Sequence, residues 1–236
     1  MYNEKQPRRG CRDVWNAFIV KGATFSSHDI PHCPSTVSTP PRALISYEEA
    51  RLIYNRQRQR KNYDFFVDTF VHFYLDDQKF DGPVSGIWHS PLRAWEILQH
   101  FAGIITPDFS TYADFPYPLK IYNVYRMRAF GYWFGRQGGA VINNVRWGTE
   151  ETFTYTFDGI PPNSMVAIGT VASGLRELKN RSVFEQGFYR MVEVLSPHTI
   201  VVYGSDQYPC FDSIRDEITV ITFPSEKNKV FGRGEQ

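Results

Sequence analysis

Short runs of apolar and β-branched residues recur from about residue 71 onward, and small or polar residues close each run. Continuous apolar runs of this length are typical of strands that are buried on both faces of a sheet. Residues 152–157 instead alternate between Thr and aromatic residues, and could form an extra strand. The main pattern predicts six strands, at residues 71–75, 103–106, 140–145, 165–168, 199–203 and 218–223.

Helical patterns with a period of about 3.6 residues lie between most of these runs. Another helix precedes them, because Ser46 and Glu49 have the spacing of a capping box, which marks a helix start. Pro197 marks the end of the last helix, since proline cannot continue one. The pattern predicts helices at residues 46–60, 91–101, 119–134 and 181–195.

Alternating strands and helices indicate β–α units, and consecutive units of this kind build a parallel sheet. Six units are too few for a closed eight-fold barrel. We therefore expect an α/β fold with a mostly parallel sheet of about six strands, flanked by helices, that is open or shaped like an incomplete barrel. With 42% hydrophobic residues, the chain can bury a core of that size.

The first 45 residues differ in character, because four prolines between residues 31 and 41 stand among Ser and Thr. This composition predicts an irregular arm outside the core over residues 1–45, followed by a single α/β domain over residues 46–236. The segment up to Lys61 is basic, with 11 Lys and Arg against 5 Asp and Glu, while the remainder holds 15 against 20. The asymmetry favours a polyanionic partner, although a solubilising segment would carry the same charge.

Four of these cations gather at the predicted end of the first helix, and they are Arg56, Arg58, Arg60 and Lys61. Contacts with the phosphates of nucleic acid are one interpretation. The other is local, because cations at a helix C-terminus interact favourably with the helix dipole. The helix near residues 122–133 poses a similar choice, since its arginines and aromatic rings could bind single strands or pack on the sheet.

The sequence lacks signals for export and for membrane insertion. No run of about 18 apolar residues exists, and the N-terminus is polar and charged rather than apolar like a signal peptide. The cysteines Cys11, Cys33 and Cys210 are far apart, so no disulfide framework is indicated. We expect a cytoplasmic protein in a reducing compartment, with no membrane partner.

Polar residues follow several of the predicted strands. In parallel α/β sheets the carboxyl ends of the strands meet at one rim, where ligands bind. Asp108 is a candidate base or metal ligand there, or else the side chain of a local turn. Arg146 is a candidate clamp for an anion, or else the partner of a nearby loop acid. Asp108 and Arg146 are the candidate catalytic residues.

Six further rim residues are candidates for ligand binding. Trp147 could stack on a base or a sugar, or cover the strand end as part of the core. Asp76 and Asp77 could hold a divalent cation together with Asp108, or end their strand in water. The loop at residues 169–174 resembles a phosphate-binding turn but has neither P-loop nor Rossmann spacing. The six are Asp77, Ser110, Trp147, Ser173, Gly174 and Ser205.

The same segments carry a resemblance to a known family. The strings VHFYLDDQKFDGPVSGIWHSP, GIITPDFSTYADFP, YRMRAFGYW, VINNVRWG, DGIPPNSMVAIGT and TIVVYGS follow one another along the chain. In this order they resemble the family catalogued as domain of unknown function 4417, found in bacteria, phages and mobile elements. The resemblance covers about residues 71–223 and leaves out the first 45. It implies a phage or mobile-element context in the cytoplasm of a bacterial host, and no catalytic role carries over from it.

Three functions are open at this point. The first is a nucleic-acid-associated protein for replication or maintenance of a mobile element, in which the basic segment holds phosphates and the Asp108–Arg146 rim holds or cuts a strand. The second is an enzyme that acts on a nucleotide or a phosphorylated small molecule, with or without a divalent metal ion. The third is a non-enzymatic protein that binds a host protein.

Overall fold

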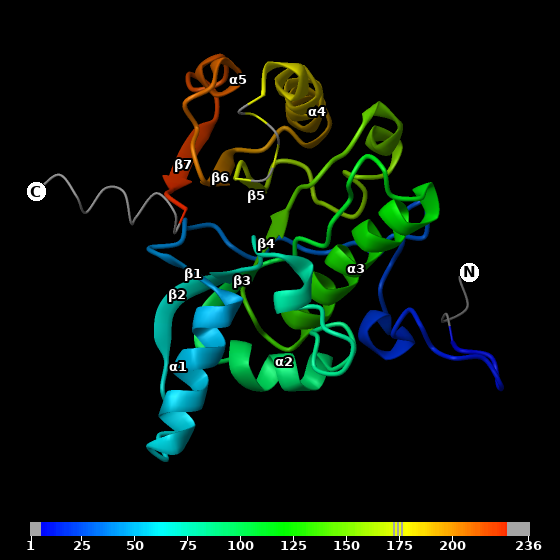
Figure 1. The fold of residues 1–236 in the computed structure, drawn as a ribbon, viewed down its shortest axis with the longest axis vertical. Helices are drawn as coiled ribbons and strands as arrows, with labels where there is room; N and C mark the ends of the chain where they lie inside the picture. The colour runs from blue at the N-terminus through cyan, green and yellow to red at the C-terminus, as the bar shows by residue number, and fades with distance from the viewer. Residues whose placement is uncertain (1–5, 172, 174, 176, 226–236) are drawn as a thin grey trace, which may run out of the picture.

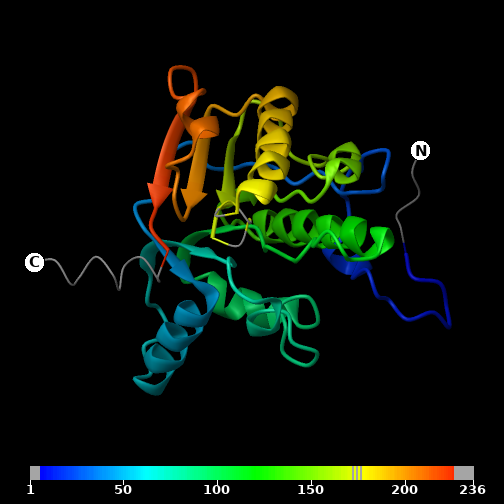
Figure 2. The same cartoon turned by 45° about the horizontal axis from the view of Figure 1, so that its top comes forward.

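One curved sheet organises the molecule. The computed structural model describes residues 6–171, 173, 175 and 177–225. Its seven strands are all parallel and stand in the same order in the sheet as in the chain. The sheet curls into a half-barrel flanked by helices (Figure 1, Figure 2). The strands are β1 Leu44–Ser46, β2 Val67–His72, β3 Phe101–Ile105, β4 Val141–Asn144, β5 Met165–Gly169, β6 Thr199–Tyr203 and β7 Thr219–Phe223.

Helices connect most strands and return the chain from the carboxyl end of one strand to the amino end of the next. The curled parallel sheet confirms the fold class expected from the apolar runs. None of the described helices is both long and apolar enough to pass through a membrane. The helices are α1 Tyr47–Gln59, α2 Pro91–Leu98, α3 Tyr117–Arg136, α4 Leu178–Leu195 and α5 Pro209–Asp212, with the short 3-10 helices η1 Ala17–Val20, η2 Asp77–Lys79 and η3 Glu150–Thr154.

Three details of the sheet differ from the expectation. Strand β1 is a seventh strand that was not predicted. Its last residue, Ser46, was expected only as a helix cap but also pairs with His72 of β2. Strand β2 begins at Val67, four residues before the predicted start. Its first half is less deeply buried and so is not part of the continuous apolar run. Residues 152–157 do not form the extra strand, because η3 occupies the segment up to Thr154 and turns follow.

The sheet is apolar on both faces, which explains the continuous apolar runs. Successive side chains of a strand point to opposite faces. Val71 and Ile104 pack in a cluster with residues of α1, α2 and α3, and Val166 packs in another with residues of α4. Phe70 and Ile105 belong to a third cluster, which fills the concave side of the half-barrel.

The N-terminal segment is part of the core, which corrects the expectation of an arm outside it. Ile19 and Cys33 are fully buried in the cluster that includes residues of α3. Their apolar neighbours are scattered among polar residues and prolines, so no periodic pattern marks them. Tyrosine hydroxyls of α3 hold the segment by donating to its backbone carbonyls, Tyr122 to Val14, Tyr125 to Trp15 and Tyr132 to Lys21.

The arginines of α3 are also structural. Arg126 and Arg128 are buried. Packing, rather than binding of single-stranded nucleic acid, therefore accounts for the arginines and aromatic residues of this helix. Arg128 donates to three backbone carbonyls, which belong to Asn144, Thr156 and Asp158. Burial lowers the pKa of Arg128 to about 10, which still leaves the guanidinium charged near neutral pH. This side chain therefore fixes the end of β4 and the segment after η3.

Candidate functional site

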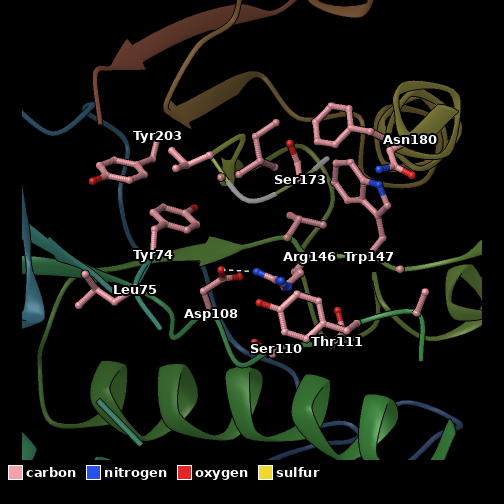
Figure 3. A pocket seen from close by; sticks show the side chains of 18 of the residues that line it. Tyr74, Leu75, Asp108, Ser110, Thr111, Arg146, Trp147, Ser173, Asn180 and Tyr203 are labelled. Atoms are coloured by element: carbon pink, nitrogen blue, oxygen red, sulfur yellow. Dashed lines mark hydrogen bonds and ion pairs between the residues drawn. The ribbon is translucent and has the colours of Figure 1, made fainter. Parts of the chain in front are cut away.

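A cavity of about 640 Å³ lies at the carboxyl end of the sheet (Figure 3). Segments at the carboxyl ends of six neighbouring strands, β2 to β7, contribute to its lining. Parallel strands in sequence order bring these segments together, as the rim rule requires. We call this space the rim cavity. Its lining includes Tyr74 after β2, Asp108 after β3, Arg146 after β4, Ser173 after β5 and Tyr203 at the end of β6.

A chain of hydrogen bonds runs across the rim cavity. The hydroxyl of Tyr74 donates to Oδ1 of Asn144 at 3.0 Å. The side-chain nitrogen of Asn144 donates to Oδ1 of Asp108 at 2.8 Å. Nη1 of Arg146 donates to Oδ2 of Asp108 at 2.5 Å (Figure 3). Both carboxylate oxygens of Asp108 are therefore engaged, and Oδ2 fixes the position of Arg146.

Burial governs the electrostatics of this chain. Burial raises the pKa of Asp108, while Arg146 and the amide of Asn144 act in the opposite direction. Burial also raises the pKa of Tyr74 well above its ordinary value, so its hydroxyl stays protonated and can donate. Because desolvation of a buried ion pair offsets much of its attraction, the pair orients the guanidinium more than it stabilises the fold.

Aromatic rings stand on opposite sides of the rim cavity (Figure 3). On one side Tyr74 and Tyr203 stack, with ring centroids 5.1 Å apart and planes 11° from parallel. On the other side lies Trp147, whose ring packs on Phe184 of α4 with 5.0 Å between the centroids. Arg146 lies between the two sides (Figure 3). Flat walls with a cation between them suit a planar ligand.

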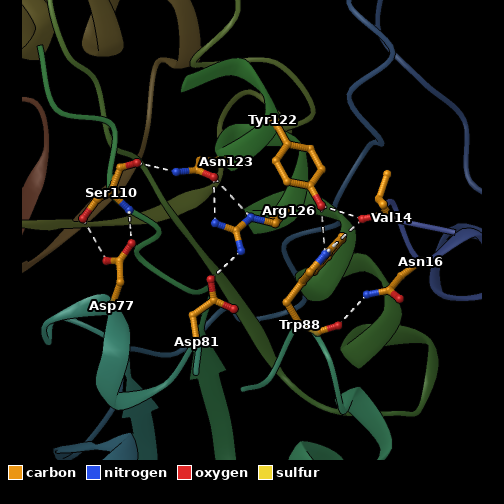
Figure 4. Close-up of polar contacts among 9 residues, drawn as sticks. All are labelled: Val14, Asn16, Asp77, Asp81, Trp88, Ser110, Tyr122, Asn123 and Arg126. Carbon is orange, nitrogen blue, oxygen red and sulfur yellow. Dashed lines mark hydrogen bonds and ion pairs between the residues drawn. The ribbon is translucent and has the colours of Figure 1, made fainter. Parts of the chain in front are cut away.

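Hydroxyl groups line the cavity on the side of α3. Asp77 holds Ser110, because its carboxylate accepts from the backbone nitrogen of Ser110 at 3.1 Å and from the hydroxyl at 2.8 Å (Figure 4). Asn123 of α3 donates to the carbonyl of Ser110 from the other direction. The buried hydroxyl of Thr111 has no hydrogen-bond partner among the described residues. A polar ligand that bonded to it would relieve the cost of burying an unpaired hydroxyl.

Most of the expected rim residues meet at this cavity. Asp77 is not among the residues that line it, but it positions Ser110. Ser205 is not a lining residue either, and its backbone binds the hydroxyl of Thr170. Gly174 lies outside the described residues. The expected residues that line the rim cavity are Asp76, Asp108, Ser110, Arg146, Trp147 and Ser173.

The cations at the end of α1 lie elsewhere. Helix α1 runs from the carboxyl end of β1 back toward the amino end of β2, so its last turn lies far from the carboxyl end of the sheet (Figure 1). Arg56, Arg58, Arg60 and Lys61 are exposed there. The rim and these cations are therefore two separate places on the molecule.

Within the described ranges, no group of three or more His, Cys, Asp or Glu side chains is arranged to hold a metal ion. Two of the acids expected to share a cation, Asp77 and Asp108, each use both carboxylate oxygens for hydrogen bonds.

Sequence reasoning missed Tyr74, Thr111 and Asn144, which all contribute to the site. Asn144 ends a fully buried strand, and a buried amide needs a partner, so its place at the end of an apolar run was a usable signal. Tyr74 lies inside an apolar run, so the sequence pattern assigned it to the core and gave no indication that its hydroxyl belongs to the site. The unpaired hydroxyl of Thr111 becomes visible only once its surroundings are placed in three dimensions.

The chain matches the family model described as "Domain of unknown function (DUF4417)" over residues 23–224. It belongs to the DUF4417 family. Relatives include the Gene 1 protein of Mycobacterium phage D29, 31% identical over 185 residues (78% of this chain and 66% of that protein). The Gene 1 protein of Mycobacterium phage L5 is 34% identical over 135 residues (57% of this chain and 56% of that protein). No solved structure matches the chain.

The DUF4417 match extends further toward the N-terminus than the resemblance suggested. It begins at residue 23, so it includes part of the segment expected to lie outside the family, in agreement with the packing of that segment into the core. The phage relatives agree with the expected phage context. The matched regions span 66% and 56% of those two proteins, less than two thirds of either.

Proposed function

We propose that this DUF4417 protein binds a nucleotide unit in the rim cavity, with the base between the aromatic sides and an anionic group at Arg146. The observation that carries the proposal is the position of Arg146 between the Tyr74–Tyr203 stack and Trp147 (Figure 3). A nucleotide joins a planar ring to a phosphate, so it matches both features at once.

The size and polarity of the rim cavity support this class of ligand. Its volume of about 640 Å³ lies within the range of roughly 300–1,000 Å³ that is typical of small-molecule sites. Toward the described residues, the guanidinium of Arg146 donates through Nη1 alone, so its other N–H groups can bind a ligand. Ser173 and Asn180 add polar groups near Trp147 (Figure 3).

In this proposal Asp108 positions Arg146. Both of its oxygens already accept hydrogen bonds, from Asn144 and from Arg146. A carboxylate engaged in this way is poorly placed to take a proton from a substrate. Binding, rather than base catalysis by Asp108, is therefore the activity that the geometry favours.

Nucleic acid, the partner expected from the sequence, would bind in the same rim cavity through one of its nucleotides. A nucleotide at the end of a single strand offers the same ring and phosphate as a free nucleotide, so one chemistry covers both sources. A strand would also be the ligand if the protein serves a mobile element. The test therefore compares free nucleotides with a short strand.

Thermal unfolding in the presence of defined probes tests the proposal. The probes are adenosine and thymidine 5′-monophosphates, thymidine, inorganic phosphate and the oligonucleotide dT4. A ligand that binds only the folded protein raises Tm, so we expect the monophosphates to raise it more than thymidine or phosphate alone. A shift with dT4 but not with the monophosphates would assign the nucleotide to a strand. No shift with any monophosphate or with dT4 at millimolar concentration would overturn the proposal.

A further inference from the structure

The end of α1 and the turn that follows it form a second surface of distinct chemistry. From Arg51 to Phe66 the chain carries five cations and a single acid, Asp64. We call the group at its far end the α1-end surface, which consists of Arg56, Arg58, Arg60, Lys61, Tyr63 and Phe66. All six residues are exposed. The surface therefore presents an excess of positive charge to solvent.

Most cations of the α1-end surface form no ion pair with the described residues. Within the described part of the chain, no carboxylate lies within ion-pair distance of Arg56, Arg60 or Lys61. The helix dipole accounts for cations in the last turn of α1. It does not account for Lys61, which lies beyond the helix, or for the aromatic rings that follow it.

Two large aromatic rings of this surface face solvent. Tyr63 is 58% exposed and Phe66 is 64% exposed. Leaving such rings in water gives up the free energy that their burial would provide. Exposed aromatic side chains beside cations are the combination with which proteins bind single-stranded nucleic acid, because bases stack on the rings while the cations follow the phosphates.

The turn after α1 holds one ring in place. Lys61 has a positive φ of 57°, which reverses the chain at the helix end. Asn62 fixes this turn by donating to Gln57 through both its backbone and its side chain, each at 3.0 Å. The Cζ of Arg58 then lies 5.8 Å from the ring centroid of Tyr63. The cation and the ring are thus organised before any ligand arrives, which lowers the entropy cost of binding.

We propose that the α1-end surface binds single-stranded nucleic acid, with bases stacked on Tyr63 and Phe66 and phosphates bound by the neighbouring cations. A duplex would leave both rings without a stacking partner, because its bases are already stacked on one another. Binding at this surface is independent of nucleotide binding at the rim, since α1 runs away from the carboxyl end of the sheet (Figure 1).

Fluorescence anisotropy with labelled dT20, and with a duplex of equal length, tests the inference over a series of salt concentrations. The charge variant is Arg56→Gln, Arg60→Gln and Lys61→Gln together. Its matched control removes three exposed cations from elsewhere in the chain, Arg8→Gln, Arg9→Gln and Arg93→Gln. We expect the charge variant to weaken dT20 binding and to flatten the slope of log K against log[salt] by about 2, because each phosphate contact contributes about 0.7.

The stacking variant, Tyr63→Leu with Phe66→Leu, separates stacking from charge. We expect it to weaken dT20 binding at least about fivefold with little change in the salt slope, since no cation is removed. Both residues are exposed, so the fold tolerates these changes.

Three results would overturn the inference. The first is no binding of dT20 at low salt. The second is an equal loss of binding in the charge variant and in its matched control, which would mean that general positive charge is responsible. The third is dT20 binding that the stacking variant retains in full, which would place the single strand elsewhere on the molecule.

Discussion

At the scale of single residues, Arg146 owes its place in the rim cavity to Asp108. The carboxylate accepts one hydrogen bond from Arg146 and one from Asn144, and Asn144 in turn accepts from Tyr74. Each member is buried or nearly so, and each has a partner. Such a chain holds the guanidinium in one orientation before a ligand binds, which is the arrangement that precise recognition requires.

The raised pKa of Asp108 has a consequence for stability. The folded protein retains a proton that the unfolded chain releases, so stability falls as pH rises from the usual pKa of aspartate through the higher folded value. Asparagine carries no such proton. We therefore expect the unfolding free energy of Asp108→Asn, relative to the native protein, to increase as pH rises from about 4 to about 7. Urea denaturation at several pH values measures this difference.

A matched control is Asp68→Asn, which removes an exposed carboxylate paired with Arg42. Its effect on the unfolding free energy should be small at every pH, because exposed ion pairs contribute little. A difference between Asp108→Asn and the native protein that stays constant with pH, or shrinks as pH rises, would contradict the burial argument.

Arg128 gives a second prediction at the residue scale. Its substitution by Met leaves three carbonyls without their donor, two of them buried, and we expect the unfolding free energy to fall by about 3 kcal/mol or more. Arg190→Met, at an exposed position of α4, should change it by less than about 0.5 kcal/mol. Chemical denaturation compares the two. A loss below about 1 kcal/mol for Arg128→Met would show that the carbonyls find other partners.

At the scale of elements, α4 shapes the rim cavity through a glycine. A Cβ at Gly187 would collide with the indole ring of Trp147, so the absence of a side chain lets this ring lie against the helix. No sequence pattern predicts this contact, since a glycine inside a helix usually indicates only weak helix propensity. It links the wall of the cavity to the packing of α4.

This contact predicts opposite effects for two similar substitutions. In a helix interior, Gly→Ala normally stabilises by about 1 kcal/mol. Gly135→Ala in α3 should follow that rule, because its Cβ would meet no atom closer than 3.6 Å. Gly187→Ala should instead lower stability and weaken nucleotide binding, since Trp147 must move. Thermal unfolding and nucleotide titration measure both effects, and equal behaviour of the two variants would rule out the proposed packing.

At the scale of the whole molecule, the sequence predicted the order of strands and helices because the sheet is buried on both faces. Each buried strand is therefore visible in the sequence as a continuous apolar run. The rule that ligands bind at the carboxyl ends of parallel strands then placed Asp108 and Arg146 at one rim. Short β1 carries too few residues for such a signal. The N-terminal segment packs through scattered residues such as Ile19 and Cys33, whose burial depends on contacts far along the chain.

The two ends of the sheet carry different chemistry. The rim cavity encloses aromatic rings around a paired arginine, while the α1-end surface offers unpaired cations and exposed rings. No local sequence signal separates these two sets, because both contain arginine and aromatic residues. Their separation follows from topology, since α1 returns toward the amino end of the sheet.

The central claim is that the rim cavity binds a nucleotide through Arg146, and isothermal titration calorimetry with adenosine and thymidine 5′-monophosphates tests it most directly. Asp108→Asn combined with Arg146→Met removes the guanidinium without leaving an unpaired buried charge, and Arg190→Met is the surface control. We predict that the native protein and the control bind alike, and that the double variant binds at least about tenfold more weakly. Equal affinity in all three would contradict the claim, and so would a native protein that binds neither these monophosphates nor dT4.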